Sequence, residues 1–244
     1  MSIYTDWGFT SNPFVQTPLL PDAQGAALLV GREQEEADLK KRLLNAPKLP
    51  VLEGANGVGK TSLINVTAYK LFNAFLESFK GPLFVPCQRS FQLSPKKDVE
   101  TFCDEILMEV AQTLLAHGKL IETKHTGSLH NSQAIHAWLN SPVFKNWQGG
   151  VPVLSFGGGS QATGSAGFQR SGFRQAVTQW LNDVFPTPEF GGVVCVIDNL
   201  ELLQTSEMAS ALLEQLRDPL FTMNGLRCVL CGAAGITWSP ELLT

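Results

Sequence analysis

The sequence lacks several features that would mark common classes of protein. It has no run of about 18 apolar residues, the length of a membrane-crossing helix, and its first six residues, Met1–Asp6, are largely polar, so we expect neither a membrane span nor a signal peptide. Charged residues make up only 16% of the chain, and the net charge of −4 provides no basic field, so contact with DNA would need a local patch or a further domain. We therefore interpret the chain as a cytoplasmic globular protein whose 44% of apolar residues build a packed core.

Cysteine and histidine are scarce and show no convincing metal-ligand spacing. The five cysteines are odd in number and lie mostly in apolar runs, which favours buried thiols in a reducing compartment. Cys228 and Cys231 have C-x-x-C spacing, but residues three apart in a strand point to opposite faces of a sheet. Joint metal ligation by this pair is therefore disfavoured.

One stretch carries a complete chemical motif. Residues 51–53 read as a short strand, residues 54–61 spell G-x-x-x-x-G-K-T, and a helix begins at Ser62. Glycines let the backbone turn its N–H groups inward around an anion, and the positive end of the next helix adds to this field. With both flanking elements present, a chance Gly-rich turn is a weak alternative, and the stretch indicates a phosphate-binding loop, the Walker A motif. Its predicted nucleotide-binding residues are Gly54, Ala55, Asn56, Gly57, Val58, Gly59, Lys60, Thr61 and Ser62.

A second apolar strand ends in an acid. Residues 193–197 are fully apolar and Asp198 follows them, which is typical of the Walker B motif, in which a buried strand carries a carboxylate to Mg²⁺. The alternative is a buried strand capped by a turn aspartate. We predict that Lys60 reaches the β- and γ-phosphates and that Thr61 and Asp198 hold Mg²⁺. The cofactors are thus ATP and Mg²⁺, with adenine favoured because no guanine-reading Asn/Thr-Lys-x-Asp motif is present.

The residue that would activate water is less clear in the sequence. Asn199 follows Asp198, and an amide can orient a water but cannot take its proton. Glu201 is the nearest carboxylate that could act as the base, Glu53 is another, and Glu201 could equally be a solvated or helix-start residue. We name Lys60, Asp198, Asn199 and Glu201 as the catalytic candidates. Slow hydrolysis, or hydrolysis completed only on assembly with a partner, is the expectation.

The remaining chain alternates apolar strands with helices, which predicts an α/β fold: a parallel sheet flanked by helices around a P-loop NTPase core. Residues 1–29 contain Pro13, Pro18 and Pro21, and we expect an irregular leader that packs on a core domain of residues 30–244. The Gly-rich stretch 149–172 is predicted to be an inserted loop or β-hairpin, mobile and exposed, with contact to a partner or DNA as the alternative. Further expected elements are helices at 34–44, 62–79, 98–117, 134–139, 173–185 and 207–217, strands at 82–86 and 227–231, and a polar region at 119–133.

Three motifs together resemble known ATPase families. Asn12-Pro13-Phe14, Val30-Gly31-Arg32-Glu33 and the P-loop resemble the AAA+ initiator proteins of the Orc1/Cdc6 type, and equally the STAND ATPases and the bacterial ExeA-like ATPases. The resemblance covers most of the chain at the level of the family. It implies that Val30, Gly31 and Arg32 lie near the adenine. The run from Asp198 to Glu201 resembles the STAND-like version of Walker B.

Two departures from these families affect the expected function. No polar sensor residue follows the strand at 227–231, and no arginine follows Arg227, so the nearest candidate for an arginine finger is Arg217, acting in trans. A helical lid does not fit in the nine residues after Gly235, and we expect a chain truncated before its lid, with a minimal ATPase core as the alternative. The expected function is a switch that binds ATP or ADP and acts with a protein partner or by self-assembly. Alternatives are a DNA-handling initiator, loader or transposition-type regulator, and a nucleotide-binding scaffold that does not hydrolyse.

Overall fold

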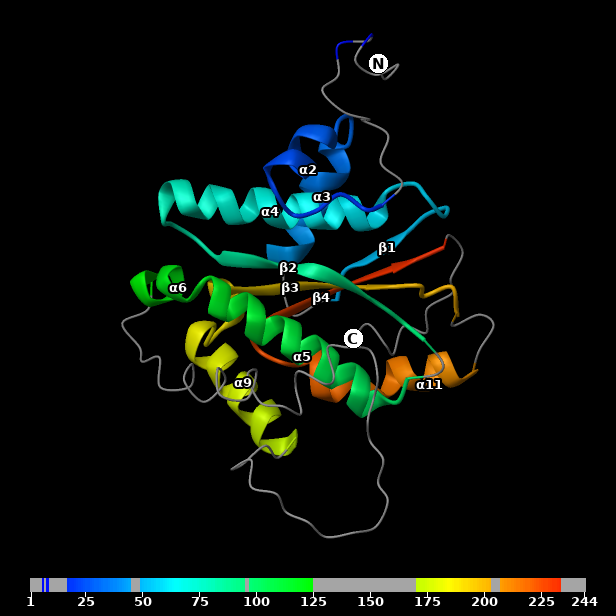
Figure 1. Ribbon diagram of the computed structural model, residues 1–244, viewed down its shortest axis with the longest axis vertical. Coiled ribbons are helices and arrows are strands. Elements are labelled where there is room, and N and C mark those ends of the chain that lie inside the picture. The colour runs from blue at the N-terminus through cyan, green and yellow to red at the C-terminus, as the bar shows by residue number, and fades with distance from the viewer. Residues whose placement is uncertain are drawn as a thin grey trace.

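The described part of the chain folds around a four-stranded parallel sheet with helices on both faces (Figure 1). The computed structural model describes residues 6, 8, 17–44, 49–94, 97–124, 170–202 and 207–233. The predicted α/β class, with a parallel sheet flanked by helices, is confirmed. The strands in chain order are β1 (Val51–Glu53), β2 (Leu83–Gln92), β3 (Gly191–Asp198) and β4 (Leu226–Gly232).

The last strand of the described chain lies inside the sheet. The spatial order is β1-β4-β3-β2, so β4 separates the strand before the P-loop from the strand that ends in Asp198. Leu230 of β4 pairs with Val51 on one side and with Ile197 on the other. Because all strands are parallel, the loops after β1 and β3 leave the sheet at the same edge.

The sheet separates two hydrophobic cores, and β3 contributes to both. Its side chains alternate between the faces, as in any strand. Cys195 and Ile197 pack in the larger core, whereas Val194 and Val196 pack in the smaller one. Cys228 lies in the larger core and Cys231 in the smaller, which confirms that the two thiols of the C-x-x-C spacing face opposite sides of the sheet.

The helices form two layers (Figure 1). The layer over the smaller core consists of α2 (Ala23–Leu28), α3 (Glu33–Leu44) and α4 (Lys60–Ser78). The opposite layer consists of α5 (Val99–Ala116), α6 (Gly118–Lys124), α9 (Arg170–Val184) and α11 (Glu207–Gln215), with the short helical segments η1 (Pro188–Phe190) and η2 (Arg217–Phe221). In the described part of the chain, no helix combines the length and the apolar character needed to cross a membrane.

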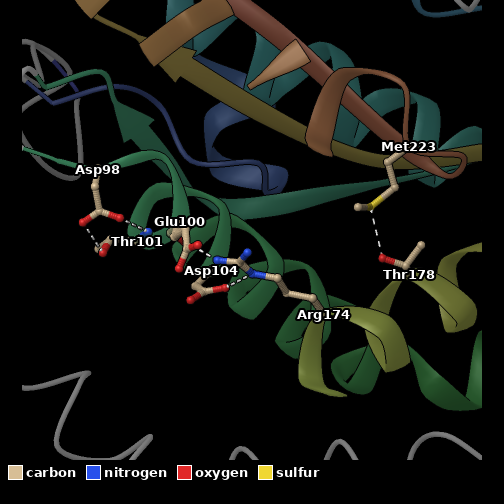
Figure 2. Close-up of polar contacts among 7 residues, drawn as sticks. All are labelled: Asp98, Glu100, Thr101, Asp104, Arg174, Thr178 and Met223. Carbon is tan, nitrogen blue, oxygen red and sulfur yellow. Dashed lines mark hydrogen bonds and ion pairs between the residues drawn. The ribbon is translucent and has the colours of Figure 1, made fainter. Parts of the chain in front are cut away.

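A buried ion pair joins α9 to α5 (Figure 2). Arg174 donates to the carboxylate of Asp104, whose side chain is almost fully buried, and also to the carbonyl of Glu100 at 2.8 Å. The N-terminus of α5 is capped next to this contact, since Asp98 accepts hydrogen bonds from the amide and the hydroxyl of Thr101. Elsewhere on α9, the Thr178 hydroxyl donates to the sulfur of Met223, which follows η2.

The strand predicted at residues 82–86 is longer in the structure. It continues to Gln92 through an irregularity between Pro86 and Ser90, where the register against β3 shifts. The buried carboxylate of Glu109 on α5 accepts the amides of Gln88 and Arg89 there, at 3.0 and 3.3 Å. These two residues are exposed and polar, so the apolar pattern gave no sign of the second half of the strand.

Two further stretches contain helices that the sequence did not suggest. The leader, expected to be irregular, contains α2, which begins after both described prolines and is capped by Asp22 accepting the amide of Gly25 at 2.7 Å. The polar region at 119–133 begins with α6, because Leu120 and Ile121 pack on the core and outweigh its polar composition. The helix predicted at 134–139, nearly all of the insertion at 149–172 and the Asn12-Pro13-Phe14 motif lie outside the described residues.

Gly191, at the start of β3, has no room for a side chain. Its φ angle is 102°, and a Cβ atom there would lie 2.0 Å from the carbonyl oxygen of Leu83. We expect Gly191→Ala to lower the free energy of unfolding by more than about 3 kcal/mol, measured by urea titration. The matched variant Gly118→Ala adds a methyl group with nothing within 4 Å and should change it by less than about 1 kcal/mol. Equal effects of the two substitutions would contradict this account.

Candidate functional site

The loop from β1 to α4 has the backbone shape that an anion site requires. Gly57 and Gly59 have φ angles of 82° and 84°, in the left-handed region that glycine adopts without strain. Gly59 is the N-cap of α4 and supplies no side-chain cap, so the amides of residues 60–62 have no partner within the helix. The N-terminus of a 19-residue helix therefore opens directly into the loop, with its positive dipole end exposed to a ligand.

Lys60 folds back over its own loop. Its ammonium donates to the carbonyl oxygens of Gly54 at 2.9 Å and Ala55 at 3.1 Å. The loop itself is held to the sheet, because the amide of Gly54 donates to the carbonyl of Gly232 on β4. An ammonium group has three donors, so Lys60 can keep a bond to the loop while it contacts an anion beside it.

Asp198 is brought against the start of α4. The hydroxyl of Thr61 donates to Oδ2 of Asp198 at 2.9 Å, although the two residues are 137 positions apart. The second oxygen, Oδ1, accepts the amide of Asn199 at 2.8 Å. Both predicted metal ligands thus lie at one point, and the orientation of the carboxylate is fixed by two hydrogen bonds.

The donor set at this point suits Mg²⁺. Hydroxyl and carboxylate oxygens are hard ligands, and Mg²⁺ in nucleotide sites is held by one or two carboxylates together with phosphate oxygens. In the described part of the chain, no group of three His, Cys, Asp or Glu side chains is placed to hold a metal ion. Thr61 and Asp198 therefore fit an ion that arrives with a phosphate ligand.

A buried thiol lies beneath the pair. Burial, together with the charge of Asp198, raises the pKa of Cys231 to about 12, although Lys60 and Thr61 act in the opposite direction. Cys231 is consequently a neutral thiol at ordinary pH. It fills space under the site and is not available as a thiolate ligand.

A cavity of about 650 Å³ opens over these groups, within the size range of pockets for small molecules. It is lined by the P-loop and the start of α4, from Asn56 to Ser62, and by Asp198, Asn199 and Glu201. The leader also lines it, with Thr17, Pro18, Leu19, Leu28 and Leu29. The charged groups of the lining therefore come from α4, the end of β3 and the turn after β3, whereas the leader contributes mostly apolar side chains.

The turn after β3 explains the residue type at position 199 and the placement of Glu201. Asn199 has a φ angle of 68°, a left-handed conformation in which asparagine is several-fold enriched among residues other than glycine. The turn is closed by hydrogen bonds from the amide of Leu200 to Cys231 and from the amide of Leu202 to Asn199. It places Glu201 at the cavity, whereas the exposed Glu53 is not among the lining residues.

The segment that the family resemblance assigns to the adenine lies beside the cavity and does not line it. The side chain of Val30 is 79% exposed, and Arg32 forms an ion pair with Glu35 at 3.1 Å. The amide of Gly31 donates to Glu33 at 3.2 Å. The two residues immediately before this segment, Leu28 and Leu29, face the cavity in its place.

The sequence did not predict the hydrogen bonds that join the leader to α4. Ser62, predicted to bind nucleotide, uses its hydroxyl to accept the amide of Leu19 at 3.0 Å. Asn65, one turn further along, donates to the carbonyl of Leu19 at 2.8 Å. Because these bonds end on the backbone of Leu19, the leader sequence shows no side-chain pattern that could have revealed them.

Comparisons with known proteins give a coarse match. No protein-family model matches the chain, and no curated protein matches it. Among solved structures it is similar to a Walker-type ATPase of Pyrococcus abyssi, at 20% identity and a TM-score of 0.40. The match covers 90% of this chain and 49% of the other, so the chain spans about half the length of that ATPase.

The geometry of Lys60 leads to a direct test of phosphate binding. Replacing it with alanine removes a charge-assisted donor beside the loop, and such hydrogen bonds contribute about 1.5–3 kcal/mol each. We expect Lys60→Ala to weaken ATP binding by at least about 100-fold in isothermal titration calorimetry.

Lys80→Ala is the control, because Lys80 is an exposed lysine beyond the far end of α4. This variant should bind ATP as the parent protein does. Tight ATP binding by the Lys60 variant would exclude the loop as the phosphate site.

Proposed function

We propose that this chain is a P-loop ATPase module that binds ATP with Mg²⁺ and acts as a nucleotide-dependent switch. The observation that carries the proposal is the 2.9 Å hydrogen bond from Thr61 to Asp198, beside a cavity of about 650 Å³. It joins the Walker A helix to the end of the Walker B strand. The two motifs lie 137 residues apart in the sequence, and their meeting is what a phosphate and metal site requires.

The phosphates would lie on the loop and the first turn of α4. The amides of residues 60–62 and the positive end of the helix favour an anion there. Lys60 already lies across the loop and would exchange a carbonyl partner for a phosphate oxygen. Thr61 and Asp198 would hold Mg²⁺, which neutralises phosphate charge when bound.

Glu201 is the residue that we assign to the activation of water. A general base must be a group that can accept a proton and must reach the reacting end of the cavity. Glu201 lines the cavity with Asp198, whereas Asn199 has no basic group and Glu53 is not a lining residue. Among the described residues that line the cavity, Glu201 is the one candidate base and there is no arginine, which supports slow hydrolysis that a protein partner or a second copy would accelerate.

The composition of the cavity wall supports a switch. Its walls come from the P-loop, the turn after β3 and the leader, three segments that a bound nucleotide would connect. A ligand that contacts all three favours the arrangement in which they lie together, and shifts the population towards it. A partner that binds this arrangement would then read the nucleotide state.

A second candidate is a scaffold that binds nucleotide without hydrolysing it. Asn199 favours this candidate, because the position directly after Asp198 carries an amide in a conformation set by its backbone. DNA handling has less support, since the chain carries a net charge of −4.

Single-turnover hydrolysis with Mg²⁺ and excess protein tests the assignment of Glu201. General bases contribute about 10²–10⁴-fold to a rate, so Glu201→Gln should slow hydrolysis by at least about 100-fold. The affinity for ATP should change by less than about 3-fold, because the isosteric amide removes only the basic group.

Glu53→Gln is the matched control and should hydrolyse ATP at the parent rate. A parent protein that turns over several ATP molecules per second would contradict the slow module. ATP binding without hydrolysis in parent and variants alike would favour the scaffold.

A further inference from the structure

The leader is tied to α4 by its backbone at one residue. The amide of Leu19 donates to Ser62 Oγ at 3.0 Å, and its carbonyl accepts from Asn65 Nδ2 at 2.8 Å. Ser62 and Asn65 are three residues apart on a helix and so lie on one face of it. The amide and the carbonyl group of Leu19 are therefore both hydrogen-bonded to side chains of α4 that lie just after the Walker A motif.

The rest of the leader is built to hold this position. Pro18 and Pro21 on either side have fixed φ angles and no N–H, which restricts the segment to an extended course. The carbonyl of Leu20 approaches Gly25 so closely that a Cβ on Gly25 would lie 2.2 Å from it. Residues 17–20, called the strap here, are thus fixed at one end by α4 and at the other by α2.

The strap adds apolar side chains to the lining of the cavity. Pro18 and Leu19 line it from the strap, and Leu28 and Leu29 line it from the end of α2. The charged groups of the lining, Lys60, Asp198 and Glu201, come from the start of α4, the end of β3 and the turn after it. A ligand with an apolar ring and a polyphosphate tail matches this lining, whereas a polyphosphate alone would use only its polar groups.

We propose that Ser62 and Asn65 are positioning residues that hold the strap over the cavity, so that the site selects a nucleoside triphosphate over inorganic triphosphate. This inference rests on the proposed function. In this inference the strap contacts the base and ribose of the ligand, and the P-loop binds its phosphates. It also gives Ser62 a role in holding the strap in place of direct contact with the nucleotide.

The test compares two ligands on one variant. Binding of ATP and of inorganic tripolyphosphate, both with Mg²⁺, is measured by isothermal titration calorimetry on the parent chain and on Asn65→Ala. Loss of one hydrogen bond, worth about 0.5–1.5 kcal/mol, should weaken ATP binding by about 3–10-fold. Tripolyphosphate binding should stay within about 2-fold, which also shows that the variant is folded and that its P-loop is intact.

Two further variants sharpen the result. Leu19→Pro removes the amide that Ser62 accepts without changing α4, and should also weaken ATP but not tripolyphosphate. Asn73→Ala replaces a half-buried asparagine on the same helix, eight residues further on, and should leave both affinities unchanged.

The outcomes separate the inference from the proposed function. If Asn65→Ala weakens the binding of ATP and of tripolyphosphate equally, or weakens neither, the role of the strap is overturned while the phosphate site stands. A parent chain that binds neither ligand would overturn both proposals.

Discussion

The hydrogen bond between Thr61 and Asp198 depends on β4. This strand lies between β1, which precedes the P-loop, and β3, which ends in Asp198. The carbonyl of Gly232 at the end of β4 accepts the first amide of the P-loop, and the carbonyl of Cys231 accepts the amide of Leu200 in the turn after Asp198. Two adjacent carbonyl groups thus fix both loops of the site. Because both loops are hydrogen-bonded to β4, the site requires this strand to be in place between β1 and β3.

The same arrangement gives the charged side chains of Lys60 and Asp198 hydrogen-bond partners. Asp198 accepts two hydrogen bonds, Lys60 donates two, and the thiol beneath them is neutral because burial raises its pKa. A buried polar cluster is costly only where groups are left unpaired. An entering phosphate would therefore replace existing hydrogen bonds, which keeps the loop ordered before the ligand arrives.

The sheet, the P-loop and the Asp198 strand could be predicted because their signals are local: glycines at fixed spacing and runs of apolar residues. The missed features depend on residues far apart in the sequence. The second half of β2 is polar, and the backbone amides of its exposed residues Gln88 and Arg89 donate to the carboxylate of Glu109 on α5. The hydrogen bond from Asn65 is accepted by the backbone carbonyl of Leu19, and a backbone group carries no sequence signature. Such contacts are fixed by tertiary packing, which a single sequence does not display.

Asn199 shows how a backbone constraint can determine the chemistry of a site. The turn after β3 needs a left-handed residue so that its next amide can reach Cys231, and asparagine adopts that conformation at lower cost than a glutamate would. A glutamate directly after Asp198 would therefore strain the turn. The turn instead carries Glu201 to the cavity two residues later. On this argument the amide at 199 reflects the shape of the turn, and it does not by itself mean that hydrolysis has been lost.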